Sequence, residues 1–274
     1  MSYLQAIILG LVQGIAEFLP ISSSGHLALI ENLFDIQAPE FYDVLLHFGT
    51  LVAVCVYYWR DIAEMILEFF RGCRALAVPA YRGEETPPAR RLVLLVIVGT
   101  LPLLLILPVK DRIEAFGDSN LFVGCMLLLT GVILFVSDRL ARGKKTERSA
   151  TVLDALLVGC AQAAATIPGI SRSGATISAG MLRGYKRTFA VRFSFLLSLP
   201  AVLGANLLSL IDVLQEGVEM TQIPVYLVGV VIAGVAGYFS IRLLETLTKR
   251  GRFGSFAYYC WVIGAVAVLC GIFL

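Results

Sequence analysis

Three ionisable residues, Glu17, His26 and Arg172, lie in stretches of the chain that are otherwise apolar or small. Glu17 and His26 belong to QGIAEFLPISSSGH (13–26), and Arg172 belongs to TIPGISRSGAT (166–176). An ionisable group among membrane-type sequence is costly, which makes it a candidate for a functional site. A carboxylate, an imidazole and a guanidinium together can bind an anion and move a proton beside it.

Arg172 lies in a Gly/Ser/Thr segment that leads into a helix, a pattern typical of a phosphate site. Free N–H groups at a helix start favour an anion, and arginine can donate two hydrogen bonds to one phosphate. We predict that Arg172 forms a phosphate cradle, with further candidates in both stretches: Ser171, Ser173, Gly174, Thr176, Ser22 and Ser24. Alternatively, Arg172 pairs with Glu17 and holds the two stretches together, and both roles are compatible.

Gln13 and Glu17 are four residues apart, so they share one face of a helix. Two oxygen-bearing side chains on one face could hold a divalent cation beside a phosphate. Hard oxygen ligands suit Mg²⁺ or Ca²⁺. The alternative is that Glu17 only forms a structural salt bridge or caps a helix.

The SSSGH segment offers Ser23 and His26 as a nucleophile and a general acid or base. The sequence does not choose between attack by Ser23 and attack by a water that His26 activates. Serines in a membrane break also bond free carbonyl groups, which is the alternative for Ser22 and Ser24. A structural role is the alternative for His26, and His47 is the only other histidine.

The composition predicts an all-α integral membrane protein without a nucleic-acid partner. The chain is 58% hydrophobic and 15% charged, with a mean hydropathy of +0.84. Its apolar runs are continuous rather than alternating, which favours helices over a barrel. Six runs are long enough to span a bilayer: 41–59, 91–109, 120–138, 188–211, 223–245 and 255–273. Two other regions, 3–34 and 153–183, are broken by Pro, Gly and Ser, and we expect each to form a re-entrant helical hairpin.

The two broken regions are similar to each other. Residues 6–25 align with 155–174 without a gap, and eight of the twenty positions are identical. We therefore predict a single membrane domain (1–274) made of two repeats, about 1–140 and about 150–274. Three spans follow each hairpin, and because three is odd the second repeat should have inverted topology.

The distribution of basic residues predicts the orientation of the chain. With the N-terminus outside, 19 of the 22 basic residues fall inside, where the positive-inside rule expects them. They form four groups: 60–91, 139–148, 183–192 and 242–252. The polar segment 71–91 should be an irregular cytoplasmic loop. The hairpins then enter from opposite sides, and their tips can meet near the middle of the membrane.

The two polar stretches closely resemble the signature regions of the BacA-type bacitracin-resistance family, the bacterial undecaprenyl pyrophosphate phosphatases. The resemblance covers the whole chain. It implies hydrolysis of undecaprenyl pyrophosphate to undecaprenyl phosphate and inorganic phosphate, at the outer face of the inner membrane and with a divalent cation. This activity recycles the lipid carrier of cell-wall synthesis and confers resistance to bacitracin.

The resemblance also implies roles for individual residues. Glu17 matches the essential carboxylate, Ser23 the proposed nucleophile, His26 the acid/base or nucleophile candidate, and Arg172 the phosphate-binding arginine. Ser173 and Thr176 match the loop that supports this arginine. Many relatives carry Glu at the place of Gln13. In this chain either Gln13 binds the metal through its carbonyl oxygen, or Glu17 and the pyrophosphate provide most of the metal ligands.

The main alternative function is a transporter or flippase of a polyprenyl phosphate or another anion, because inverted repeats with broken helices are common in transporters. A serine and a histidine beside the arginine favour an enzyme, since a carrier has little need of them. A non-catalytic scaffold would leave the buried ionisable cluster unexplained. The sequence leaves the oligomeric state open, with a homodimer as one option.

Overall fold

The computed structural model describes residues 1–77, 86–216 and 220–273. In this part of the chain all named elements are helices. The first half contains α1 (Tyr3–Ala16), α2 (Ser23–Phe34), α3 (Glu40–Tyr57), α4 (Trp59–Ala77), α5 (Pro88–Thr100), α6 (Lys110–Glu114) and α7 (Asn120–Leu140). The second half contains α8 (Val152–Ala164), α9 (Arg172–Leu182), α10 (Arg187–Glu216), α11 (Ile223–Lys249) and α12 (Phe256–Phe273).

The helices confirm the predicted class of all-α, multi-pass membrane protein. Among the described residues, five segments are long and apolar enough to cross a bilayer. They are Pro88–Val109, Asn120–Leu140, Arg187–Leu207, Ile223–Lys249 and Phe253–Phe273. The sixth predicted span, 41–59, corresponds to α3, after which the chain bends by 84° into α4.

The predicted irregular loop over 71–91 is wrong at both ends. Helix α4 continues to Ala77 and α5 begins at Pro88, while 78–85 lie outside the described residues. The buried Glu68 of α4 accepts hydrogen bonds from Arg71 at 2.8 Å and from Arg90 of α5 at 3.0 Å. These ion pairs join α4 to α5. The charged residues at the ends of the two helices are the reason why the sequence predicted a loop there.

The predicted span at 91–109 is not a continuous α-helix. Helix α5 ends at Thr100, and the chain continues as two 3₁₀ helices, η2 (Leu101–Leu105) and η3 (Leu107–Val109). Each 3₁₀ helix has a proline in its first turn, at Pro102 and Pro108. Proline supplies no N–H to the helical ladder, so the α-helical hydrogen bonds cannot continue through it.

Each broken region consists of two short helices, α1–α2 and α8–α9, which we call hairpin 1 (3–34) and hairpin 2 (152–182). Helices α1 and α8 are apolar but too short to count as spans. This agrees with hairpins that dip into the membrane, and their re-entrant placement stays a prediction.

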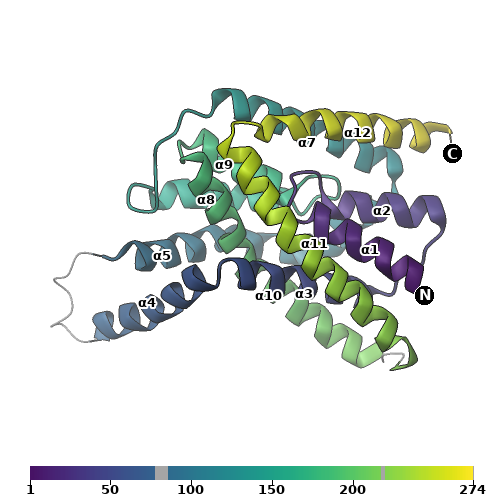
Figure 1. The fold of residues 1–274 in the computed structure, drawn as a ribbon, viewed down its shortest axis with the longest axis horizontal. Coiled ribbons are helices and arrows are strands. Elements are labelled where there is room, and N and C mark those ends of the chain that lie inside the picture. The colour runs from purple at the N-terminus through teal and green to yellow at the C-terminus, as the bar shows by residue number, and fades with distance from the viewer. Residues whose placement is uncertain (78–85, 217–219, 274) are drawn as a thin grey trace.

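The two hairpins pack against the bundle in matching ways. Helix α1 packs on α11 and α8 packs on α5, so each hairpin lies against a helix of the other half. A Cβ at Gly10 would overlap the backbone of Gly229, and one at Gly159 would overlap the backbone of Gly99. Small residues at such crossings let membrane helices approach closely. Figure 1 shows α1 against α11, and it places both termini at the same end of the molecule.

Candidate functional site

The tips of the two hairpins line one cavity of about 490 Å³. Hairpin 1 contributes Glu17, Ser23 and Ser24 to its wall, and hairpin 2 contributes Ser171 and Arg172. Helices α3, α6, α8 and α10 supply further polar side chains. The structure therefore brings together, in one cavity, residues that lie about 150 positions apart in the sequence.

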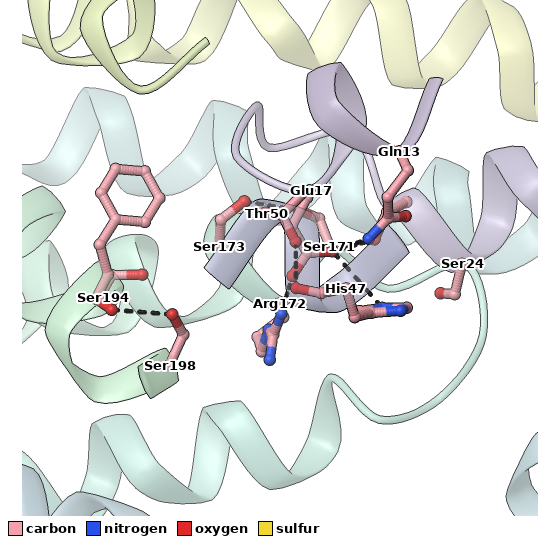
Figure 2. A network of polar contacts seen from close by, with 12 residues as sticks. Gln13, Glu17, Ser24, His47, Thr50, Ser171, Arg172, Ser173, Ser194 and Ser198 are labelled. Atoms are coloured by element: carbon pink, nitrogen blue, oxygen red, sulfur yellow. Dashed lines mark hydrogen bonds and ion pairs between the residues drawn. The ribbon is translucent and has the colours of Figure 1, made fainter. Parts of the chain in front are cut away.

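Glu17 is the centre of the polar network in this cavity (Figure 2). Its side chain is only 6% exposed, and its Oε1 forms an ion pair with Nη2 of Arg172. Its Oε2 accepts hydrogen bonds from Ser23 Oγ at 2.7 Å and from Gln13 Nε2 at 3.2 Å. The pairing of Glu17 with Arg172 shows that these two residues do join the hairpins, as one of the two predicted roles of Arg172 requires.

Each hairpin presents a helix N-terminus to the cavity. Ser22 caps α2 by accepting a hydrogen bond from the backbone N–H of Gly25 at 3.2 Å. Ser171 caps α9 in the same way, from Gly174 at 3.1 Å. The next residues, Ser23 and Arg172, are the first of their helices and line the cavity. Two helix starts at one place favour an anion there.

Ser173 and Thr176 support the arginine from behind rather than lining the cavity. The hydroxyl of Ser173 donates to the carbonyl oxygen of Leu19 at 3.3 Å and so fastens hairpin 2 to hairpin 1. The hydroxyl of Thr176 donates to the carbonyl oxygen of Arg172 at 2.8 Å. Their predicted contact with phosphate stays a prediction, as does that of Ser22 and Gly174, whose polar groups form the helix caps.

His26 does not line the cavity. Its Nδ1 lies 2.8 Å from the carbonyl oxygen of Ser22, and its Nε2 lies 2.9 Å from the hydroxyl of Tyr259 on α12. The two rings are stacked with their centroids 5.6 Å apart. In this arrangement both ring nitrogens are engaged away from Glu17. The role of His26 in proton transfer stays a prediction, and in this structure the His26 ring does not contact the Glu17 carboxylate.

The histidine that lines the cavity is His47, for which the sequence suggested no role. Its Nε2 lies 3.9 Å from Glu17 Oε2, and its Nδ1 lies 2.9 Å from the carbonyl oxygen of Asp43 one turn earlier in α3. A carbonyl only accepts hydrogen bonds, so the proton is assigned to Nδ1 and Nε2 is left to exchange protons in the cavity. The signal available in the sequence was an imidazole inside an apolar span.

The residues present fit a divalent cation only in part. Among the described residues, no cluster of three or more His, Cys, Asp or Glu side chains could hold a metal ion. Mg²⁺ is often held by one or two carboxylates and completed by substrate phosphates. Glu17 lines the cavity and fits that pattern. The Oε1 of Gln13 has no hydrogen-bond partner in the described part of the chain, but Gln13 is fully buried and does not line the cavity. A cation site stays a prediction.

The chain is similar to known proteins over nearly its whole length. Residues 6–266 match the family described as bacitracin resistance protein BacA. A protein of Methanosphaera stadtmanae named undecaprenyl-diphosphatase is 42% identical and covers 99% of both chains. A protein of the same name from Halothermothrix orenii is 40% identical, and the match covers 100% of both chains. Another from Syntrophotalea carbinolica is 43% identical, and the match covers 97% of this chain and 98% of the relative. The chain therefore belongs to the BacA family of bacitracin resistance proteins.

Proposed function

We propose that this protein is an undecaprenyl-diphosphatase, which hydrolyses undecaprenyl pyrophosphate to undecaprenyl phosphate and inorganic phosphate. The observation that carries the proposal is the contact of Glu17 with both Ser23 and Arg172 at two helix N-termini. The name shared by the relatives supports the same reaction.

In this mechanism Arg172 and the helix N-termini bind the terminal phosphate and neutralise the charge that develops on it. Ser23 Oγ attacks the terminal phosphorus, and its proton passes to Glu17 Oε2 along the 2.7 Å hydrogen bond. The bond from this phosphorus to the bridging oxygen breaks and leaves undecaprenyl phosphate. Water then hydrolyses the phosphoserine, with His47 near enough to Glu17 to take part in the proton transfer.

A divalent cation, when bound, would add positive charge beside the pyrophosphate, with Glu17 as its main protein ligand. Direct attack by a water is the alternative to attack by Ser23, and Glu17 can serve as the base in either case. The two routes use the same residues to bind the phosphate and accept the proton, and they differ in whether a phosphoserine forms.

The polyprenyl tail needs an apolar path out of the cavity. A groove of about 570 Å³ lies between α4, α5 and α10, and its wall is almost wholly apolar. The groove and the cavity involve successive residues of the same two elements, since Leu104 and Pro200 line the groove while Leu103 and Ala201 line the cavity. We place the first part of the tail in this groove, with the pyrophosphate in the cavity.

The positive-inside pattern supports an orientation with the N-terminus outside. Lys110, in the segment expected outside, lines the cavity, which supports a cavity open to the outer side of the inner membrane. Cysteine labelling of the 139–150 and 110–118 segments tests this orientation. Labelling of the first segment by a membrane-impermeant reagent added from outside would contradict it.

The decisive experiment is release of phosphate from undecaprenyl pyrophosphate by the purified protein in detergent, with and without a chelator. We expect release by the wild type and its near-complete loss in Arg172→Ala. If well-folded wild-type protein releases no phosphate, the proposal is wrong, and the transport of polyprenyl phosphate across liposomes becomes the next measurement.

A further inference from the structure

Gln162 of α8 is a buried amide that the network around Glu17 does not use. It is 1% exposed and lines the same cavity as Arg172. Neither its Nε2 nor its Oε1 has a hydrogen-bond partner among the described residues. Because both atoms are unpaired, the amide group lacks a partner in either of its two possible orientations. A buried polar group without a partner is costly, so a ligand or an ordered water in the cavity is expected to bind it.

The equivalent residue of hairpin 1 is partly satisfied within the protein, because its nitrogen has a partner while its Oε1 has none among the described residues. Gln13 aligns with Gln162, and its Nε2 donates to the carboxylate of Glu17. At the place of Glu17, hairpin 2 has Thr166, whose hydroxyl donates to the carbonyl oxygen of Ala163 at 2.8 Å. Hairpin 2 therefore keeps the amide but has no acidic side chain to receive its hydrogen bond.

Asn206 of α10 is a second unpaired amide in the cavity wall. Its Nδ2 is buried and has no hydrogen-bond partner in the described part of the chain. Arg172 and Lys110 also line this cavity, and so do the acidic Glu17 and Asp43. The two neutral donors add no charge of their own, and because they lack an acceptor they suit an anion with several acceptor oxygens.

We infer that Gln162 and Asn206 bind the phosphate of the substrate that stays attached to the polyprenyl chain. This inference rests on the proposed function. Ser23 and Glu17 determine where the transferred phosphorus must lie, so the two amides remain for the other phosphate. They are substrate-binding residues that contact the pyrophosphate in the ground state and the transition state alike, and they should therefore affect KM more than kcat.

The test uses Gln162→Met and Asn206→Leu, which keep most of the volume but remove the amide. For each variant we expect KM for undecaprenyl pyrophosphate to rise about 10-fold, as for one lost hydrogen bond, with kcat within about 3-fold of wild type. Inhibition by undecaprenyl phosphate should weaken by a similar factor, while inhibition by inorganic phosphate should not change.

Thermal stability separates substrate binding from a structural role. Without ligand, Gln162→Met should melt at or above the wild-type temperature, because it removes an unpaired buried amide. Thr248→Val is the matched control, since Thr248 is 1% exposed with an unpaired hydroxyl, on α11 and outside the cavity. This control should leave KM and product inhibition unchanged.

Two results would overturn the inference: unchanged KM and product inhibition in both variants, or loss of melting temperature with kcat falling as much as KM rises. Failure of the proposed function gives a different result. Wild-type protein would then be stabilised by undecaprenyl phosphate without hydrolysing the pyrophosphate, and the loss of that stabilisation in Gln162→Met would still support the binding role.

Discussion

Hairpin 1 and hairpin 2 have the same local architecture but different chemistry. Each begins with a capping box, from Ser2 in α1 and from Thr151 in α8. Each second helix is capped by a serine, and each first helix has a glycine that packs on the glycine of another helix. The side chains at the tips differ in charge: Glu17 aligns with Thr166, and Ser23 aligns with Arg172. One repeat thus supplies the carboxylate and the hydroxyl, and the other supplies the cation.

The tips also turn in different ways. In hairpin 2 the left-handed conformation falls on Gly169, at φ +92°, where a Cβ would clash with the backbone of Val123. In hairpin 1 it falls on Ser22, at φ 72°. Such a conformation costs a residue other than glycine about 1–3 kcal/mol and is often found at functional sites. The strained residue lies directly before Ser23, which agrees with the role proposed for its hydroxyl.

The largest expected effect comes from exchanging the charges of the two tips. Glu17→Arg combined with Arg172→Glu keeps an ion pair but reverses it. We expect the exchange to restore the melting temperature that either single change lowers, while phosphate release stays down about 10³–10⁵-fold. Measuring both quantities separates pairing from phosphate binding. Recovery of activity in the exchanged protein would mean that the pair is only structural.

The next effect concerns the two serines that open α2. Ser23→Ala removes the hydroxyl that donates to Glu17, and we expect phosphate release to fall about 10³–10⁴-fold. Ser24→Ala is the matched control, because Ser24 also lines the cavity without a hydrogen bond to Glu17. Radiolabel from terminally labelled substrate should be trapped on the wild type by an acid quench. A protein that hydrolyses the substrate but never retains the label would indicate attack by water instead.

A smaller effect compares the two histidines. His47→Ala should lower kcat about 10²-fold, because His47 faces Glu17 in the cavity. His26→Ala should lower activity less, because His26 is bonded to Tyr259 outside the cavity. Tyr259→Phe should then resemble His26→Ala. The opposite ranking of the two histidines would show that the resting geometry differs from the reactive one.

The smallest effect concerns the helix starts, and it should change stability rather than catalysis. Asp154 is buried at the start of α8, where it accepts hydrogen bonds from Lys145 at 2.7 Å and Arg183 at 2.9 Å. Asp154→Asn should lower the free energy of unfolding by about 2–3 kcal/mol at neutral pH. Gln5→Ala, at the half-buried equivalent in hairpin 1, should cost less than about 1 kcal/mol.

The stabilisation by Asp154 should depend on pH. Burial alone would raise the pKa of this carboxyl, but the hydrogen bonds from Lys145, Thr151 and Arg183 outweigh it and hold the pKa below its usual range. A depressed pKa stabilises the fold above the unfolded value of about 3.9 and loses this contribution as the pH falls. The difference in melting temperature between wild type and Asp154→Asn should therefore shrink below about pH 4. A constant difference down to pH 3 would contradict this account.

The sequence by itself determined the class of the protein, the two broken regions and most of the polar residues at their tips. Continuous apolar runs can only be helices in a bilayer, and a charge inside them needs a purpose. The pairing of Glu17 with Arg172 could be anticipated because the stretch around Arg172 contains no acidic residue. The end of helix α4 could not be predicted in this way, because the ion pairs of α4 with α5 form only after both helices have folded.

Only the tertiary structure decided which side chains share the cavity. The sequence favoured His26 as the acid–base group, but α2 directs His26 toward Tyr259 while α3 directs His47 toward Glu17. Gln162 is marked in the sequence only as the repeat equivalent of Gln13, and Asn206 is not marked at all. An amide in a helix points to a ligand only when its neighbours are known to offer it no hydrogen bond. Sequence patterns report the environment of a segment as a whole, whereas the orientation of one side chain depends on what packs around it.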